Sequence, residues 1–313
     1  MIKVISIKEI LNGYKEVLYS DGRKYKGIFV NNKRQVEGTV YYTNGKTYCG
    51  NWKDDKKEGS GTIVQKCGCK FLGTFRNNIA NGLCIHLSCK GDFIRGTWKD
   101  GTLTGQGSYH LKSGDMYTGS FKNNLKDGRG VLTEKSGNRY VGYWKKDKRE
   151  GDGFMIYSSG ESYQGSWKSN KFNGYGIYYY SNGDKYVGFW ENNKKHGCGC
   201  HTQSNGNKFR GDFRNGVKQG YGVFSYANGD KLIGSWNNNK KNGKFFTIYS
   251  NNMYLTYWND NNIVKGCTTK EKDGKFEEDD FDSFKSALTL MSFKRKRKNL
   301  VCDFKRNTNR KLI

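Results

Sequence analysis

The chain has 313 residues, of which 42 are glycine, 15% are aromatic and none is proline, and its formal net charge is +26. Its nine cysteines are an odd number, no signal peptide is visible, and no run reaches the about 18 apolar residues of a membrane-spanning helix. These features disfavour a disulfide-stabilised secreted domain and a helical membrane protein, so we expect a reduced, cytoplasmic protein. The positive charge favours anionic partners such as acidic proteins, nucleic acid or anionic lipid.

Residues 1–24 lead into a long array of internal repeats. Their last part, from Asn12-Gly13 to the turn Ser20-Asp21-Gly22, has the pattern of the second half of the repeats that follow. We therefore expect an N-terminal cap that contains a half repeat.

Ten segments of 23 residues follow from Tyr25 to Tyr254 without an insertion or a deletion. We number the positions within each repeat from its leading residue, which is position 0. A glycine at position 2 and an aromatic residue at position 4 occur in all ten copies. A fixed period of this length is the signature of a stacked repeat array, in which each unit buries its apolar face against its neighbours.

Each repeat has the pattern of a β-hairpin. In the copy that begins at Tyr140, side-chain alternation places Tyr140, Gly142 and Trp144 on one face, where we expect the glycine to make room for an aromatic ring of the neighbouring repeat. A polar turn, a second strand with Gly151 and Gly153, and a tight turn follow. Most lysines fall at turns, where we interpret them as solvated.

A chain of such hairpins predicts an all-β fold, an elongated single-layer antiparallel sheet of stacked hairpins with one face lined by aromatic residues. The pattern Tyr-x-Gly-x-Trp, Gly-x-Gly and Asn-Gly-Asp at a 23-residue period resembles the MORN repeat (membrane occupation and recognition nexus). The resemblance assigns residues 25–267 to one array. Copies depart from the pattern where Val36 and Cys84 replace second-strand glycines.

Candidate metal and phosphate sites are explained better by the repeat itself. His196, Cys198, Cys200 and His201 lie around two repeat glycines, and an extended Cys-x-Cys cannot wrap one ion well. Cys67 and Cys69 flank a turn glycine and receive the same structural interpretation. Gly45-Lys46-Thr47 lacks the glycine and the helix of a phosphate-binding loop. We predict no metal site, no cofactor and no catalytic group.

The tail, residues 268–313, differs from the array. Phe281, Phe284, Leu288 and Met291 follow helical spacing and predict a short C-terminal amphipathic helix near 279–297. A basic cluster ends this segment: Lys294, Arg295, Lys296, Arg297 and Lys298. Three interpretations remain open for the segment, namely a cap on the last sheet edge, a helix that binds a membrane surface or a partner, and a nuclear localisation signal.

The resemblance implies a non-catalytic scaffold that binds protein partners at a membrane or cytoskeletal surface, with another copy of the chain as one partner to consider. Some proteins with similar repeats carry a methyltransferase or lipid-kinase domain after the array, but only about 46 residues follow Cys267, too few for such a domain. Candidate groove aromatics are Trp144, Trp167 and Trp190. The alternative function is direct binding of an anionic phospholipid membrane through the basic cluster, which would make the protein membrane-peripheral, whereas nucleic acid is disfavoured.

Overall fold

The computed structural model describes residues 3–11, 13–250 and 252–267, and the chain divides into two compact units, residues 1–181 and residues 182–313. These described residues form 24 β-strands and no helix, so none of them belongs to a helix that could cross a membrane. The predicted helix near 279–297 and the rest of the predicted tail lie outside the described residues.

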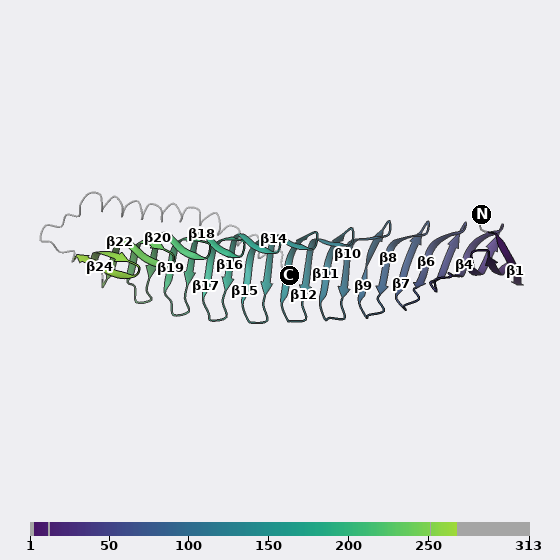
Figure 1. Cartoon of the computed structure of the whole chain (residues 1–313), viewed down its shortest axis with the longest axis horizontal. Helices are drawn as coiled ribbons and strands as arrows, with labels where there is room; N and C mark the ends of the chain where they lie inside the picture. Colours follow the sequence, from purple (N-terminus) through teal and green to yellow (C-terminus); the bar gives the residue numbers. More distant parts are fainter. Residues whose placement is uncertain (1–2, 12, 251, 268–313) are drawn as a thin grey trace. The chain divides into compact units, whose positions relative to one another are not determined.

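Unit 1 contains the first sixteen strands, and consecutive strands within it pair antiparallel (Figure 1). They are β1 (Val4–Leu11), β2 (Tyr14–Tyr19), β3 (Lys24–Val30), β4 (Lys33–Tyr41), β5 (Thr47–Lys53), β6 (Lys56–Val64), β7 (Lys70–Arg76), β8 (Ile79–Leu87), β9 (Phe93–Lys99), β10 (Thr102–His110), β11 (Met116–Lys122), β12 (Leu125–Thr133), β13 (Arg139–Lys145), β14 (Lys148–Ile156), β15 (Ser162–Lys168) and β16 (Lys171–Tyr179). The predicted half repeat is β2, and β1 adds a strand before it.

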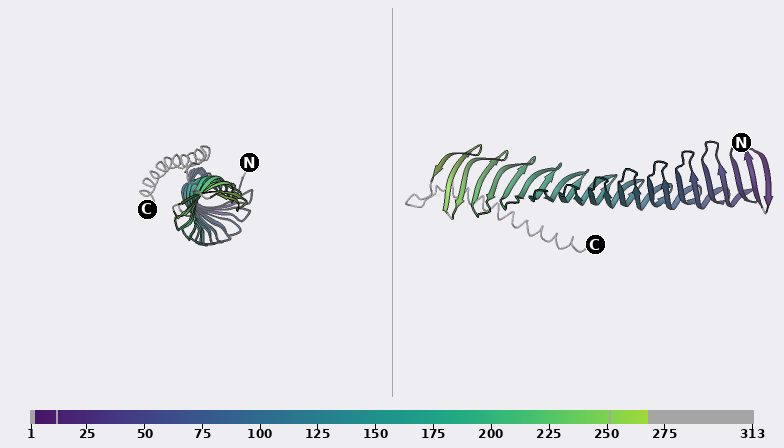
Figure 2. Two further views of the ribbon diagram at one scale, coloured as in Figure 1. Left: turned by 90° about the vertical axis from the view of Figure 1, so that its left-hand side faces the viewer. Right: turned by 90° about the horizontal axis from the view of Figure 1, so that it is seen from below.

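Unit 2 contains the other eight strands in the same arrangement (Figure 2). They are β17 (Lys185–Glu191), β18 (Lys194–Thr202), β19 (Lys208–Arg214), β20 (Val217–Ser225), β21 (Lys231–Asn237), β22 (Lys240–Tyr249), β23 (Asn252–Asn259) and β24 (Asn262–Cys267). The predicted all-β antiparallel sheet of consecutive hairpins is therefore confirmed for the described residues.

Two kinds of turn join the strands, and both tie one repeat to the next. The two-residue turn between β13 and β14 has positive φ at Lys146 (48°) and Asp147 (64°), as a type I′ turn requires. The Asp147 amide donates to the Lys126 carbonyl at 3.0 Å, and the Lys126 amide donates to Asp147 Oδ1 at 2.9 Å. On the other edge, the Lys135 amide donates to Asp115 Oδ1 of the preceding tight turn at 2.9 Å.

A row of glycines crosses unit 1 through the register of successive strands, and tyrosine rings lie against it. Gly142 pairs with Gly153, and a Cβ atom on Gly153 would lie 2.5 Å from Cε2 of Tyr140. The Tyr140 hydroxyl donates to the Tyr143 carbonyl at 3.0 Å. The glycines therefore make room for the tyrosine of their own repeat, whereas the sequence analysis expected a ring of the neighbouring repeat.

A β-bulge in each two-residue-turn hairpin explains the first glycine of the second strand. The register shifts between Gly142 and Trp144, and Gly151 opposite the shift has a φ of 66°. This left-handed conformation is ordinary for glycine and costly for a β-branched residue. Val36 occupies the same repeat position with a φ of 58°, so the first repeat carries backbone strain.

Replacing Val36 with glycine should remove this strain and raise the free energy of unfolding by about 1 kcal/mol, since an L-residue in this region costs about 1–2 kcal/mol and added chain entropy offsets part of the gain. Urea unfolding followed by circular dichroism measures the change. The matched control is Val30→Gly, because Val30 is an exposed strand residue whose φ is not positive. This variant should destabilise the protein. Equal destabilisation by both variants would contradict the interpretation.

Buried tyrosines make stability depend on alkaline pH. Burial raises the pKa of the position-0 tyrosines of five repeats in unit 1: Tyr25, Tyr48, Tyr117, Tyr140 and Tyr163. An acid whose pKa is raised on folding contributes stability that is fully present below its unfolded pKa, about 10 for tyrosine, and is lost as the pH rises further. Burial also lowers the pKa of Lys57 and of Lys195 to about 8, which acts in the opposite direction above pH 8.

We therefore expect the free energy of unfolding to rise modestly above about pH 8 and to fall steeply above about pH 10. Urea unfolding over a pH series gives the free energy, and absorbance near 295 nm gives tyrosinate formation. The variant Tyr140→Phe introduces the residue type that Phe209 provides at the same position of another repeat, and it should make the alkaline loss shallower. Titration of these tyrosines near pH 10 in the folded protein would refute the prediction.

Candidate functional site

The candidate groove tryptophans lie inside the packed face of the sheet. Trp144, Trp167 and Trp190 are only 5%, 4% and 6% exposed. Trp144 meets Tyr140 of its own repeat edge-on, with 5.1 Å between ring centroids, and meets Tyr117 of the preceding repeat at 5.6 Å. These rings hold successive repeats together. Their direct contact with a partner remains a prediction, and their burial leaves little of each ring on the surface.

Basic side chains lie over this aromatic face. Arg149 places its guanidinium carbon 4.6 Å from the Trp167 ring centroid and 5.7 Å from that of Tyr140, and Lys126 places Nζ 4.7 Å from that of Trp144. Such contacts are cation–π interactions. Position 9 is basic in seven of the ten repeats: Arg34, Lys57, Lys126, Arg149, Lys195, Lys218 and Lys241.

These seven residues are exceptions to the interpretation that most lysines are solvated. Lys57 is 9% exposed, and burial lowers its pKa to about 8, against which the attraction of the Tyr48 ring at 4.7 Å acts. The signal was present in the sequence as a column of basic residues at position 9. It was missed because a long basic side chain at the start of a strand looks solvated unless the ring beneath it is known.

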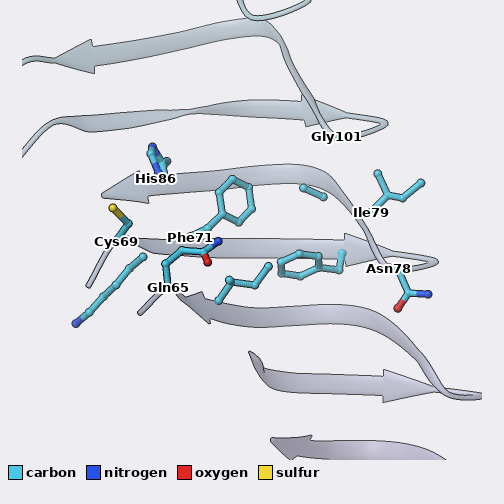
Figure 3. A pocket seen from close by; sticks show the side chains of 11 residues that line it. Gln65, Cys69, Phe71, Asn78, Ile79, His86 and Gly101 are labelled. Carbon is cyan, nitrogen blue, oxygen red and sulfur yellow. The ribbon is translucent and has the colours of Figure 1, made fainter. Parts of the chain in front are cut away.

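At the repeat whose position 9 is Ala80, unit 1 has a pocket (Figure 3). Ala80 takes the place of the cation. Gly101 lacks the Asn side chain that accepts the position-9 amide in the neighbouring repeats, although its own amide still donates to the Ala80 carbonyl at 3.0 Å. The resulting space has a volume of about 460 Å³. It is lined by Ile63, Gln65, Cys69, Lys70, Phe71, Phe75, Asn78, Ile79, Ala80, His86 and Gly101.

The same repeat departs from the glycine row. Cys84 replaces the second-strand glycine, is 1% exposed, and its Sγ is the nearest atom to a Cβ built on Gly73. It thus fills the space that a tyrosine ring occupies in most other repeats. The leading residue, Phe71, keeps the usual edge-on contact with the position-4 aromatic of the next repeat, Trp98, and also borders the pocket. This repeat is therefore open where the others are filled.

The opposite face of the sheet is apolar over β12 to β16. One register row crosses these strands in the order Val131, Val141, Phe154, Gln164 and Ile177. The corresponding row over β4 to β6 consists of Thr39, Cys49 and Thr62. Large side chains are exposed on the apolar part: Tyr143 (43%), Phe154 (37%), Ile156 (37%) and Tyr179 (42%). We call this surface, formed by residues 131–179, the apolar outer face.

The edge of unit 1 with the two-residue turns carries a row of exposed bases. Position 5 is basic in six consecutive repeats: Lys53, Arg76, Lys99, Lys122, Lys145 and Lys168. Because each repeat adds two strands, neighbouring members of this row are about 9.6 Å apart along the sheet. We call these residues the basic edge. The predicted basic cluster Lys294, Arg295, Lys296, Arg297 and Lys298 lies outside the described residues.

Three cysteine side chains meet in one place, whereas the cysteines and histidines of another segment face different partners. His201 Nε2 lies 3.2 Å from Asp184 Oδ2, and Cys198 donates to Asp212 Oδ1 at 3.2 Å, so these two side chains face different carboxylates. The Sγ atoms of Cys67, Cys69 and Cys89, in contrast, all lie within 4.8 Å of one another. Of these three, only Cys67 and Cys69 are close together in the sequence, because Cys89 comes from the next repeat.

No curated protein matches the sequence. Among solved structures, the SAS-4 (dCPAP) TCP domain of Drosophila melanogaster, in complex with a proline-rich motif of Ana2, is 14% identical with a TM-score of 0.32, and the match covers 50% of this chain and 86% of that one. The TCP10 domain of Danio rerio CPAP, in complex with a STIL peptide, is 9% identical with a TM-score of 0.25, over 84% of this chain and 98% of that one. These TM-scores are too low to support an argument about function.

The family model described as MORN repeat matches nine segments that together span more than half of the chain. They are residues 25–47, 48–65, 95–116, 117–139, 140–162, 163–185, 186–208, 209–231 and 233–244. Residues 66–94 are unmatched, and they contain Phe71, Ala80 and Cys84, where the repeat has lost its usual packing. The resemblance in the sequence is thus confirmed, and the chain belongs to the MORN-repeat family.

Proposed function

We propose that this protein is a non-catalytic scaffold in the cytoplasm that binds a protein partner through the apolar outer face. The observation that supports this most strongly is that the described residues leave the large side chains of Tyr143, Phe154, Ile156 and Tyr179 exposed on one face. The aromatic residues that build the array lie on the other face and are buried. Contiguous exposed apolar side chains on a folded domain mark an interaction surface.

The geometry of this face suits an elongated protein segment. Phe154 pairs with Val141 on one side and Gln164 on the other, so its ring stands in a row that crosses several strands. A partner that lies along the row can contact one side chain from each strand. Aromatic residues within such a surface are the usual sources of binding energy.

Charge around the apolar outer face indicates an acidic partner. Arg129 lies over the Tyr143 ring at 5.2 Å, and Arg139 pairs with Ile156 across the sheet. Lys145 and Lys168 of the basic edge end two of the same strands. A segment with apolar side chains flanked by Asp or Glu would complement this arrangement and would be steered to it by charge.

A photo-crosslinking amino acid at Phe154 should capture this partner, while the same group at Thr62, which holds the same repeat position in the polar part of unit 1, should not. The partner is then purified, and its affinity is measured by calorimetry against Phe154→Glu and the control Thr62→Glu. We expect Phe154→Glu to weaken binding by about 2 kcal/mol or more, because it removes an aromatic anchor and buries a charge. Equal affinity of the two variants would refute the site.

A second candidate function is supported by the basic edge, namely binding of an anionic membrane surface. Six exposed bases at one repeat position form a continuous row along one edge of unit 1. Each base near an anionic leaflet contributes about 1 kcal/mol, and the attraction is screened by salt. The protein would then be membrane-peripheral.

Charge reversal tests this candidate with vesicles of phosphatidylcholine containing phosphatidylserine. Lys99→Glu/Lys122→Glu/Lys145→Glu should abolish salt-sensitive co-sedimentation, since three reversals remove about 3 kcal/mol or more of attraction. The matched control, Lys66→Glu/Lys112→Glu/Lys135→Glu, changes the net charge equally on the tight-turn edge and should still bind. A chain without residues 285–313 measures the share of the tail. Equal loss in both triple variants would reduce the effect to net charge and contradict a specific edge.

A further inference from the structure

Three cysteines from two successive tight turns meet at one edge of unit 1. Cys67 and Cys69 belong to the turn between β6 and β7, and Cys89 belongs to the turn between β8 and β9. The Sγ atoms of Cys67 and Cys69 are 3.2 Å apart, and all three Sγ atoms lie within 4.8 Å of one another. Cys67 and Cys89 are exposed, and Cys69 is half-buried, so the cluster is open to solvent on one side.

The turn geometry explains why two cysteines separated by one residue converge. Gly68 has a φ of 90°, which reverses the chain and brings the side chains before and after it to the same side. An extended Cys-x-Cys would not present both thiols to one ion, and that was the basis of the structural interpretation from the sequence. The tight turn removes this objection.

Contact between repeats brings in the third cysteine. Cys69 holds position 21 of its repeat, and the same position of the next repeat is Asp92. Asp92 Oδ1 accepts the Lys112 amide of the following tight turn at 3.0 Å. In the same way, Cys69 Sγ accepts the Cys89 amide of the next tight turn at 3.0 Å. The sulfur therefore takes the place of a carboxylate in the regular bond between turns, which fixes Cys69 beside the turn that carries Cys89.

We propose that Cys67, Cys69 and Cys89 form a binding site for a thiophilic d¹⁰ cation, Zn(II) or Cu(I). A metal–sulfur distance of about 2.3 Å places three thiolates of a trigonal or tetrahedral site about 4 Å apart, which the observed separations accommodate with small side-chain shifts. Thiolates select these soft or borderline ions over Mg²⁺ and Ca²⁺. The solvent-facing side leaves a coordination position for water or an external ligand.

Charge balance is consistent with this assignment. Binding displaces one proton from each of three thiols, so the complex with Zn(II) carries a net charge of −1 and that with Cu(I) a net charge of −2. Lys66, Lys70 and Lys90 adjoin the three cysteines in the sequence and supply compensating positive charge.

A metal at this site would also stabilise the repeat whose packing departs from the common pattern. The metal would link the turns at both ends of the repeat that contains Ala80 and Cys84, which lacks the usual cation and glycine. Cys69 lines the pocket of this repeat as well as the cysteine cluster. A ligand that binds the folded state alone raises its stability by mass action. Metal should therefore raise the thermal midpoint of the protein.

The test uses the full chain, reduced and freed of metal, and titrates Zn(II) in competition with a chromophoric chelator and Cu(I) in competition with a Cu(I)-specific chelator. Co(II) in place of Zn(II) reports sulfur coordination through its thiolate charge-transfer absorbance. The repeat pattern itself supplies a conservative variant, Cys67→Ser/Cys69→Asn/Cys89→Ser, because serine or asparagine holds each of these positions in other copies. Asn138 at position 21 makes the same bond to the next turn as Asp92, so this variant keeps the turn contact.

Wild type should bind one equivalent of metal with thiolate absorbance and a higher thermal midpoint. The triple variant should lose more affinity than the about 10- to 100-fold typical of second-shell changes, while its circular dichroism stays unchanged. The control Cys198→Ser/Cys200→Ser alters the other Cys-x-Cys of the chain and should bind metal like wild type. Wild-type affinity in the triple variant, or absence of thiolate absorbance in reduced wild type, would overturn the proposal, and the two chelator arms show which ion binds more tightly.

Discussion

The close approach of a tyrosine ring to a pair of glycines is the constraint on which the array depends. The Tyr140 ring leaves no space for a Cβ atom on Gly153, and its hydroxyl bonds to the Tyr143 carbonyl. A single-layer sheet has no second layer to bury its apolar face. This chain obtains burial by laying large rings on a backbone without side chains, so aromatic residues and glycine take over the part that aliphatic residues have in an ordinary core.

Departures from this constraint accumulate in one repeat. Cys84 fills the space over the glycine row, and Ala80 provides no cation over the rings. The pocket, the gap in the family match at residues 66–94 and the cysteine cluster all fall in or beside this repeat. Relaxed packing and unusual side-chain chemistry thus occur together, as is expected where a local rule is broken for a purpose.

Much of this structure could be predicted because the repeat pattern multiplies a weak signal tenfold. One Gly-x-Trp says little, but ten copies in register determine the strands, the turns and the buried face. Side chains with two plausible environments could not be assigned in this way. Lys57 looks solvated until Tyr48 is seen beneath it, and the proximity of Cys89 to Cys67 depends on the bond between successive turns, which joins residues 20 positions apart.

Packing uses one face of the sheet and the proposed partner site lies on the other, which limits where binding specificity can reside. Most repeats present an aromatic leading residue, a glycine and a second aromatic residue to the packed face, so that face varies little from one repeat to the next. The outer face differs along unit 1, from Thr39 and Thr62 to Phe154 and Ile177. Changes there leave the glycine row untouched, because alternation along a strand separates the two sets. The array can thus vary what it binds without the loss of stability that a change at Tyr140 or Gly153 would impose.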